Sequence, residues 1–499
     1  MNNLYLVIPM VALAWAFPAT GNTLNVPAQY ATIQSAINAV TDGDTVQVAA
    51  GTYYENLFWQ NKSLALIGAG ADVTTVDGGG TGRCLTMQNV PSTARVEGFT
   101  FTGGSATYGG GLSLADSSPM LVDNIITGNS ALLGGGLDLR YNSCATVVGN
   151  TFTSNSAERV GGGLTVFGSS PTLTSNIISS NWAGQHGGGL WVNISSATLT
   201  SNIISGNSAN SAFGGGGGLG LYHASPTLTN NIIEGNSAHH GAGLDACYYS
   251  SPTLTNNTIA GNAGGGVYNH GDPAGYPYAI GTPIITNCIL WANSGYDLSG
   301  ASATYSDIGA GEVAAEGNIS ADPMFVAGGS GDYHLQDGSP CTDAGSNSAP
   351  ALPDTDKDGN PRIVGAAVDM GAYECQGPKV IAVAIDIKPG SYPNAINLGS
   401  YGLIPVAILS SDKFDATTVN PETVGLAGAG VAVRGKSNKY MAHEEDVNGD
   451  GLVDLVVQVA TENLDPGSLQ DGFAVLTGKT FDGVPIEGKD EIIIVPPEK

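Results

Sequence analysis

Residues 169–181 read SSPTLTSNIISSN, and the motif returns as SSATLTSNIISGN (195–207), ASPTLTNNIIEGN (224–236) and SSPTLTNNTIAGN (250–262). One asparagine recurs through these repeats with steps of 26, 26, 26, 29, 26 and 30 residues, at Asn124, Asn150, Asn176, Asn202, Asn231, Asn257 and Asn287. A fixed period of this length indicates a solenoid, a propeller or a repeat array.

Each repeat contains three short apolar runs, such as GGGLTV, PTLT and NII, separated by Ser, Asn, Gly and Pro. Runs of this length with alternating character, bounded by turn residues, are typical of β-strands. Three strands in every ~26 residues predict a parallel β-helix of about ten coils, each strand pairing with its counterpart one coil on, ~4.8 Å away. The recurring asparagine suits a sharp corner in the left-handed conformation, with its amides stacked along the axis, so we assign it a structural role.

The composition fits this prediction and limits the classes of molecule that the protein could bind. The chain has 499 residues, which favours more than one domain, and its 73 glycines and 12% charged residues suit a turn-rich β-solenoid. The net charge of −27 argues against nucleic acid or an anionic membrane as a partner. It also disfavours an anionic polysaccharide unless cations mediate the contact.

The N-terminal region has two parts. Residues 1–20 contain the apolar run LYLVIPMVALAWAF and small residues, which predicts a signal peptide and export; no second apolar segment is long enough to span a membrane. Further on, Thr32 is placed to cap a short helix whose apolar face holds Ile33, Ala36, Ile37 and Val40. Such a helix closes the open end of a solenoid.

Two sets of motifs resemble a known family. TIQSAI (32–37), DGDTV (42–46) and GTYYEN (51–56) resemble the entry segment of pectate-lyase-like right-handed β-helix proteins. GNISADPMFV (317–326), YHLQDGSPCTDAG (333–345) and the run from 353 to 375 resemble the closing coils of secreted bacterial β-helix proteins of the "choice-of-anchor" type. The resemblance implies a right-handed β-helix over 24–375, with closing coils at 303–375. It implies no single activity, because the superfamily holds lyases, glycosidases, esterases and adhesins.

The remainder, 379–499, is rich in alternating Val and Ile and predicts a small antiparallel β-sandwich. It contains the pattern D-x-N-x-D-G-x-x-D, whose oxygen ligands predict a structural Ca²⁺ site at Asp446, Asn448, Asp450 and Asp454. A second acidic loop has Asp354, Asp356 and Asp358 as candidate ligands, with a turn-fixing role as the equal alternative.

The cysteines permit disulfides if the chain is exported. Cys341 and Cys375 bracket the closing segment and are the best candidate pair among the six cysteines. Cys288 follows the corner asparagine directly and is expected to be a buried thiol.

One face of the solenoid is a candidate binding site. If Leu137, Leu164, Leu190, Leu219, Leu244 and Val267 point inward, each following residue points outward. Insertions at 208–218 and 269–282 flank the same face and are expected to wall a groove, with Tyr276 in the second loop. Aromatic rings in a polar trough suit sugars. The candidate substrate-binding residues are Asp138, Arg140, Trp191, Tyr222, His240, Asp245, Tyr268 and His270.

Catalysis has weaker support in the sequence. Asp138 and Asp245 fall four coils apart, ~19 Å, whereas glycosidases need carboxyls ~5–9.5 Å apart. The hypothesis is therefore an extracellular protein that binds polysaccharide or a cell-surface component, or acts as an adhesin-like rod. A polysaccharide lyase that uses His240, His270 or Tyr268 in the same groove, a metal site at His240, Asp245 and His270, and a passive spacer remain the alternatives.

Overall fold

A computed structural model of the chain describes residues 21–211, 214–270, 281–310, 315–376, 380–435, 439–469 and 472–495. The predicted signal peptide, 1–20, lies outside these residues. The chain divides into two compact units, one ending at Cys375 and the other beginning at Gln376. In the described residues, no helix is long and apolar enough to cross a membrane.

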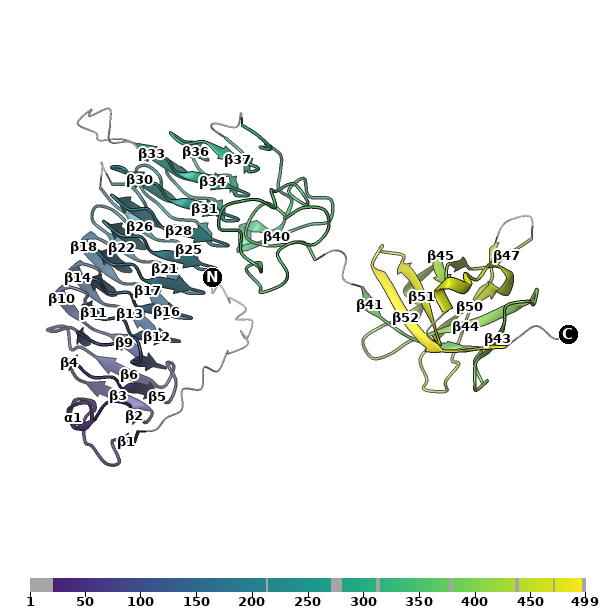
Figure 1. Cartoon of the computed structure of the whole chain (residues 1–499), viewed down its shortest axis with the longest axis horizontal. Coiled ribbons are helices and arrows are strands. Elements are labelled where there is room, and N and C mark those ends of the chain that lie inside the picture. The colour runs from purple at the N-terminus through teal and green to yellow at the C-terminus, as the bar shows by residue number, and fades with distance from the viewer. Residues whose placement is uncertain are drawn as a thin grey trace. The chain divides into compact units, whose positions relative to one another are not determined.

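The first unit is the parallel β-solenoid that the repeats predict (Figure 1). Among the described residues, three long parallel sheets form its sides. Sheet A comprises β1 (Thr23–Val26), β2 (Thr45–Val48), β5 (Ala65–Gly68), β8 (Arg95–Glu97), β12 (Met120–Val122), β16 (Thr146–Val148), β20 (Thr172–Thr174), β24 (Thr198–Thr200), β28 (Thr227–Thr229), β31 (Thr253–Thr255), β34 (Ile284–Thr286) and β37 (Ala303–Thr304). Sheet B comprises β3 (Gly51–Tyr54), β6 (Thr74–Asp77), β9 (Thr100–Thr102), β13 (Ile125–Thr127), β17 (Thr151–Thr153), β21 (Ile177–Ser179), β25 (Ile203–Ser205), β29 (Ile232–Glu234), β32 (Thr258–Ala260), β35 (Ile289–Trp291) and β38 (Asp307–Ile308).

Sheet C carries the predicted binding face. It comprises β4 (Leu57–Gln60), β7 (Leu85–Gln88), β11 (Leu112–Ala115), β15 (Leu137–Arg140), β19 (Leu164–Phe167), β23 (Leu190–Asn193), β27 (Leu219–Tyr222), β30 (Leu244–Cys247), β33 (Val267–His270) and β36 (Leu298–Ser299). In addition to the three predicted strands per coil, five successive coils carry a short fourth strand. These strands form sheet D: β10 (Ser105–Tyr108), β14 (Ser130–Leu133), β18 (Ser156–Val160), β22 (Trp182–Ala183) and β26 (Ser208–Ala209).

A continuous apolar core fills the solenoid, and helix α1 (Ile33–Ala39) covers its first coil. Thr32 caps α1 through a capping box with Ser35, and Ile33, Ala36 and Ile37 are buried, as predicted. The short strands of sheets A and B bury their middle residue and direct their flanking residues outward, which is why Leu, Ile or Val alternates with Thr and Ser.

The buried asparagines form two hydrogen-bonded ladders along the axis. In the predicted ladder, the backbone N–H of each asparagine donates to the side-chain oxygen one coil on, at 2.9 Å from Asn124 to Asn150. The second ladder stands five residues further along each coil, at Asn129, Asn155, Asn181, Asn207, Asn236, Asn262 and Asn293, and ends on Asp297. These side chains satisfy the buried backbone groups at two corners of every coil.

Two details of the predicted corner are wrong. The left-handed residue precedes each ladder asparagine and is, for example, Ser175 (φ 55) or Asn256 (φ 55). Asn287 belongs to this left-handed column (φ 55), and Cys288 takes the ladder position, where it accepts from the N–H of Asn257 at 3.5 Å. Cys288 is a buried thiol, as expected.

Residues 315–375 form what we term the closing lobe. The predicted closing coils end at β37 and β38; the chain then leaves the solenoid and packs on the outer face of sheet B (Figure 1). Its only described strands are β39 (Phe325–Ala327) and β40 (Asp332–Leu335), with the 3-10 helix η1 (Gly328–Ser330) between them. Tyr333 and Ala372 cover Ile232 and Ala260. The last strands of sheet B carry apolar residues outward, and covering them is favourable.

The second unit is built mainly from antiparallel strands. One sheet holds β41 (Ile381–Ala382), β52 (Pro485–Glu491), β51 (Phe473–Thr480), β45 (Val419–Leu426) and β46 (Ala429–Gly430). The other holds β42 (Ala384–Ile387), β44 (Leu403–Leu409), β50 (Asp454–Ala460) and β49 (Ala442–Glu445). Smaller elements are β43 (Ala395–Asn397) with β53 (Ile493–Val495), β47 (Val433–Arg434) with β48 (Lys439–Tyr440), and the 3-10 helices η2 (Ala416–Thr418), η3 (Thr461–Asn463) and η4 (Pro466–Leu469). A shared apolar core, which includes Val406, Val457 and Leu476, joins the two sheets.

Candidate functional site

The outward residues of sheet C form one column along the solenoid axis. Strand pairing places Asp138, Thr165, Trp191, Gly220, Asp245 and Tyr268 directly side by side in successive coils. The preceding residue of each strand, leucine or valine, lies in the core, so alternation turns these residues outward, as predicted.

This column is the floor of a groove of about 1170 Å³. One wall comes from sheet D and the turns that follow it; the other comes from the last residues of the sheet C strands and the turns after them. The groove is lined by Tyr108, Leu133, Asp138, Arg140, Tyr141, Arg159, Val160, Thr165, Val166, Phe167, Gln185, His186, Trp191, Asn193, Tyr222, His239, His240, Asp245, Cys247, Tyr248 and Tyr268. A volume of this size accommodates a ligand several times larger than a single sugar ring.

Aromatic rings follow one another along the groove. The Trp191 ring lies 6.2 Å from that of Tyr222, which lies 4.6 Å from that of Tyr248. His186 is 5.2 Å from Trp191 on its other side. The indole lies across the next coil because Gly220 has no side chain there: a Cβ at Gly220 would come within 2.6 Å of the ring. Trp191 is therefore 9% exposed and forms part of the floor.

Two buried carboxylates of the floor are each held by a cationic or titratable partner. Asp138 accepts from Arg140 at 2.6 and 2.8 Å and from the Thr165 hydroxyl at 2.7 Å. The Arg140 guanidinium also lies 3.7 Å above the Tyr108 ring. Burial lowers the pKa of Arg140, but the bond to Asp138 outweighs it and the net pKa is raised, so the guanidinium keeps its charge.

The second carboxylate lies near the opposite end of the groove. Asp245 is fully buried, and its Oδ1 lies 3.6 Å from Nδ1 of His240. The Tyr268 ring is 5.1 Å from the His240 ring and 5.7 Å from that of Tyr296. Cys247, next to this group, has its pKa raised by burial and by the Asp245 charge, and is therefore a neutral thiol.

Seven of the eight predicted binding residues line this one groove: Asp138, Arg140, Trp191, Tyr222, His240, Asp245 and Tyr268. The side chain of His270, Tyr276 and most of the 269–282 loop lie outside the described residues. Sequence reasoning missed Tyr108, Arg159, His186 and Tyr248. Two of them, Tyr108 and Arg159, belong to the unpredicted sheet D. Tyr248 directly follows a sheet C strand, a position that the repeat alignment could have identified.

The predicted calcium loop is an exposed turn in which the acidic side chains cap backbone N–H groups. Asp446 accepts from Gly449 and Gly451, and Asp450 accepts from Leu452. Asn448 accepts from the N–H of Asp450, and the buried Asp454 accepts from Ser410 and Val447. Across the described residues, no group of three or more His, Cys, Asp or Glu side chains is placed to hold a metal ion. The calcium site stays a prediction.

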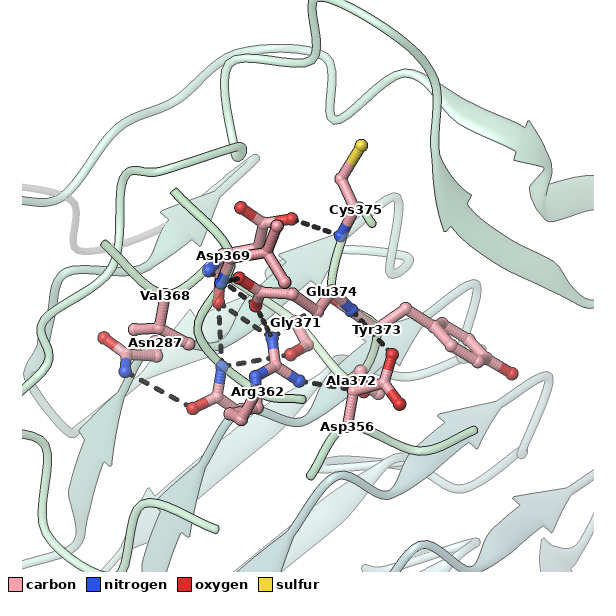
Figure 2. Close-up of polar contacts among 12 residues, drawn as sticks. Asn287, Asp356, Arg362, Val368, Asp369, Gly371, Ala372, Tyr373, Glu374 and Cys375 are labelled. Carbon is pink, nitrogen blue, oxygen red and sulfur yellow. Dashed lines mark hydrogen bonds and ion pairs between the residues drawn. The ribbon is translucent and has the colours of Figure 1, made fainter. Parts of the chain in front are cut away.

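In the second acidic loop the side chains make contacts that fix a turn, and a metal site there stays a prediction. Asp356 is buried and accepts from the N–H groups of Asp358 and Asn360. It also accepts from the N–H of Glu374 (Figure 2). Asp358 pairs with Nε2 of His334 at 2.8 Å. The backbone oxygen of Asp354 accepts from the N–H of Arg362.

Arg362 is the centre of the buried polar network in the closing lobe (Figure 2). It pairs with Glu374 at 3.0 Å and donates to the carbonyl oxygens of Asp369, Ala372 and Tyr373. These bonds hold together backbone that forms no sheet.

The predicted disulfide is not formed. Cys341 and Cys375 are both thiols. Cys341 is buried and its Sγ lies 3.2 Å from Oδ2 of Asp307, in the last coil. Cys375 is held through its backbone N–H by Asp369, and its side chain points away from the Arg362 network (Figure 2).

Comparisons with known proteins agree with the fold of the repeats. Residues 84–259 and 161–308 match the family described as "Right handed beta helix region". No curated protein matches the chain. Among solved structures, the chain is similar to pectate lyase Pel9A, with 15% identity, a TM-score of 0.46, and coverage of 68% of this chain and 90% of that one.

Two further solved structures are similar at lower scores. Pectin methylesterase from carrot has 11% identity and a TM-score of 0.32, with 57% of this chain and 86% of that chain covered. Tailspike protein 2 of Escherichia coli O157:H7 bacteriophage CAB120 has 11% identity and a TM-score of 0.34, with 92% of this chain and 65% of that chain covered. The matched region, 84–308, carries a right-handed parallel β-helix.

Proposed function

We propose that the protein binds an extended polysaccharide along the sheet C groove, outside the cell. The observation that carries the proposal is the run of aromatic rings on the groove floor and wall, from Trp191 through Tyr222 to Tyr248. Rings in neighbouring coils are spaced by the ~4.8 Å between strands, so successive parts of one chain can each find a ring along the axis. Aromatic faces next to polar groups suit the apolar faces and hydroxyls of sugars.

The polar groups between the rings fit this ligand. Asn193 and Gln185 line the groove and offer amide donors and acceptors to hydroxyl groups. Because the groove follows successive coils, it can hold several units of an extended polymer. An adhesin-like role at a cell surface would use the same face.

The test is the affinity of the full-length protein and its variants for a panel of polysaccharides, measured by affinity electrophoresis. Tyr222→Ala and Tyr268→Ala should each weaken binding by about 1 kcal/mol, because each removes one stacking ring. Trp191 is less suitable for truncation, because its nearly buried ring is part of the floor. Tyr54→Ala is the matched control: this tyrosine is 77% exposed and lies on β3 of sheet B.

Loss of affinity in both groove variants but not in Tyr54→Ala would support the proposal. If the parent binds no polysaccharide of the panel, or the groove variants bind as the parent does, the groove is not a glycan site. The solenoid would then be better described as a passive spacer.

A further inference from the structure

The pair formed by His240 and Asp245 has features that binding alone does not require. Asp245 is fully buried on the groove floor, whereas the His240 side chain is 22% exposed and lines the groove. Nδ1 of His240 faces Oδ1 of Asp245 at 3.6 Å. A carboxylate that faces one ring nitrogen orients the imidazole and stabilises its protonated form, while the other nitrogen, Nε2, lies on the opposite edge of the ring.

The local chain leaves space for this pair. Gly215, from the preceding coil, bridges to His240 in parallel. A Cβ at Gly215 would come within 2.1 Å of Asp245 Oδ2 and 2.6 Å of His240 Nδ1. Any other residue at 215 would therefore displace the carboxylate or the imidazole. Burying a carboxylate costs several kcal/mol unless it is well paired, and such arrangements cluster at functional sites.

The charged groups of the groove limit the kind of glycan that it binds and the kind of bond that it could cleave. The lining holds two carboxylates, Asp138 and Asp245, and two guanidinium groups, Arg140 and Arg159, so its formal charge is balanced when His240 is neutral. The floor is therefore balanced in charge, within a chain of net charge −27, and suits a neutral glycan. The two carboxylates stand four coils apart, ~19 Å, well beyond the ~5–9.5 Å used to cleave a glycosidic bond. Hydrolysis of an ester substituent on a sugar, by contrast, needs one general base and one water molecule.

We propose that His240 is a general base, with Asp245 as its positioning residue, that hydrolyses acyl esters on a neutral polysaccharide bound in the groove. This inference rests on the proposed function, because the groove must first hold the chain. Nε2 takes a proton from water while the water oxygen bonds to the ester carbonyl carbon. The bond between that carbon and the sugar oxygen then breaks, and the imidazolium returns the proton to the sugar oxygen. One ester and one water give one carboxylic acid and one hydroxyl.

The experiment measures acetate release from acetylated xylan and acetylated glucomannan by the full-length protein. Binding to acetylated and deacetylated preparations is measured on the same samples. The parent should release acetate, with a rate that rises with pH as the imidazolium loses its proton and then levels off. His240→Gln should keep its affinity and lose roughly 10²–10⁴-fold in rate. His443→Gln replaces an exposed histidine of the second unit and is the control; it should behave as the parent.

Asp245→Asn separates positioning from a purely structural role. It should lower the rate and change its pH dependence, because the imidazolium loses its carboxylate. Added imidazole should restore part of the rate of His240→Ala, which keeps the inference testable if His240→Gln folds poorly.

Binding without acetate release by the parent would overturn the inference and leave the proposed function standing. New unsaturated ends or new reducing ends in place of acetate would also overturn it, since they would indicate a lyase or a glycosidase. Undiminished release by His240→Gln would do the same. Absence of binding to every preparation would instead defeat the proposed function itself.

Discussion

Replacing Asn181 by alanine should destabilise the solenoid severely, although Asn181 does not line the groove. Its Oδ1 accepts from the backbone N–H of Asn155 at 3.0 Å and from Nδ2 of Asn155 at 3.1 Å. Its Nδ2 donates to Phe152 O at 2.9 Å and to Asn207 Oδ1 at 3.0 Å. The variant leaves two buried donors of Asn155 without this acceptor and removes a donor from a buried carbonyl.

Asn155 Nδ2 keeps its bond to the Ile126 carbonyl, so the groups that lose a partner are the backbone N–H of Asn155 and the Phe152 carbonyl. At ~1–3 kcal/mol for each, the total expected loss is about 2–6 kcal/mol. Ser180→Ala is the matched control, because its side chain is exposed and its backbone N–H bonds to Ser205 in either case. The assay is urea denaturation followed by circular dichroism, comparing midpoints and slopes of the solenoid transition. Because coils are stabilised by their neighbours, the variant should also broaden the transition. A midpoint equal to that of Ser180→Ala would refute the reasoning.

The fold was predictable because one physical rule acts again in every coil. Inward leucines such as Leu137 and Leu164 fix the direction of the residue that follows, so Asp138 and Trp191 could be placed on one face without coordinates. The helix cap at Thr32 follows equally from local chemistry. Residues whose direction is set by alternation were therefore assigned to the correct face.

What could not be predicted depends on contacts between different coils. Sheet D has strands of two to five residues, rich in Ser and Ala, with too little alternation to be recognised. The proximity of His240 to Asp245 depends on the missing side chain of Gly215, 25 residues earlier than His240. The sequence analysis placed Asn287 in the asparagine ladder, but it occupies the left-handed position one residue earlier. The insertion before it hides the repeat register, and asparagine also occurs at the left-handed position, as at Asn256.

The closing lobe shows the same limit. Its resemblance to known closing segments predicted coils, but the chain there contains few strand-length apolar runs and is held by side-chain bonds instead. The Arg362 network reaches the Asn230 side chain, 132 residues away in the sequence, and the buried Asp356 binds the backbone N–H of Glu374, 18 residues away. A sequence motif identifies such a segment but does not predict the path of its backbone.

Two predictions concern ions. If the Asp446 loop binds Ca²⁺, EGTA should lower the melting temperature at which the second unit unfolds in the full-length protein. Asp450→Asn should abolish that response. A melting curve that EGTA does not change would contradict the site. The other concerns His334, which lies between Asp332 and Asp358 at 2.6 and 2.8 Å. Its hydrogen bond to Asp358, helped by Asp332 and opposed by burial, raises its pKa from 6.5 to about 9. Because the folded-state pKa lies above that of the unfolded chain, this stabilisation is complete below pH 6.5 and is lost as the pH rises through about 9. The side chain is 41% exposed, so solvent screening limits the contribution to about 1 kcal/mol. The stability difference between the parent and His334→Gln should therefore be largest below pH 6.5 and shrink towards pH 9. A difference that does not vary with pH would mean that the substitution acts through packing on Tyr373 and not through the ion pair.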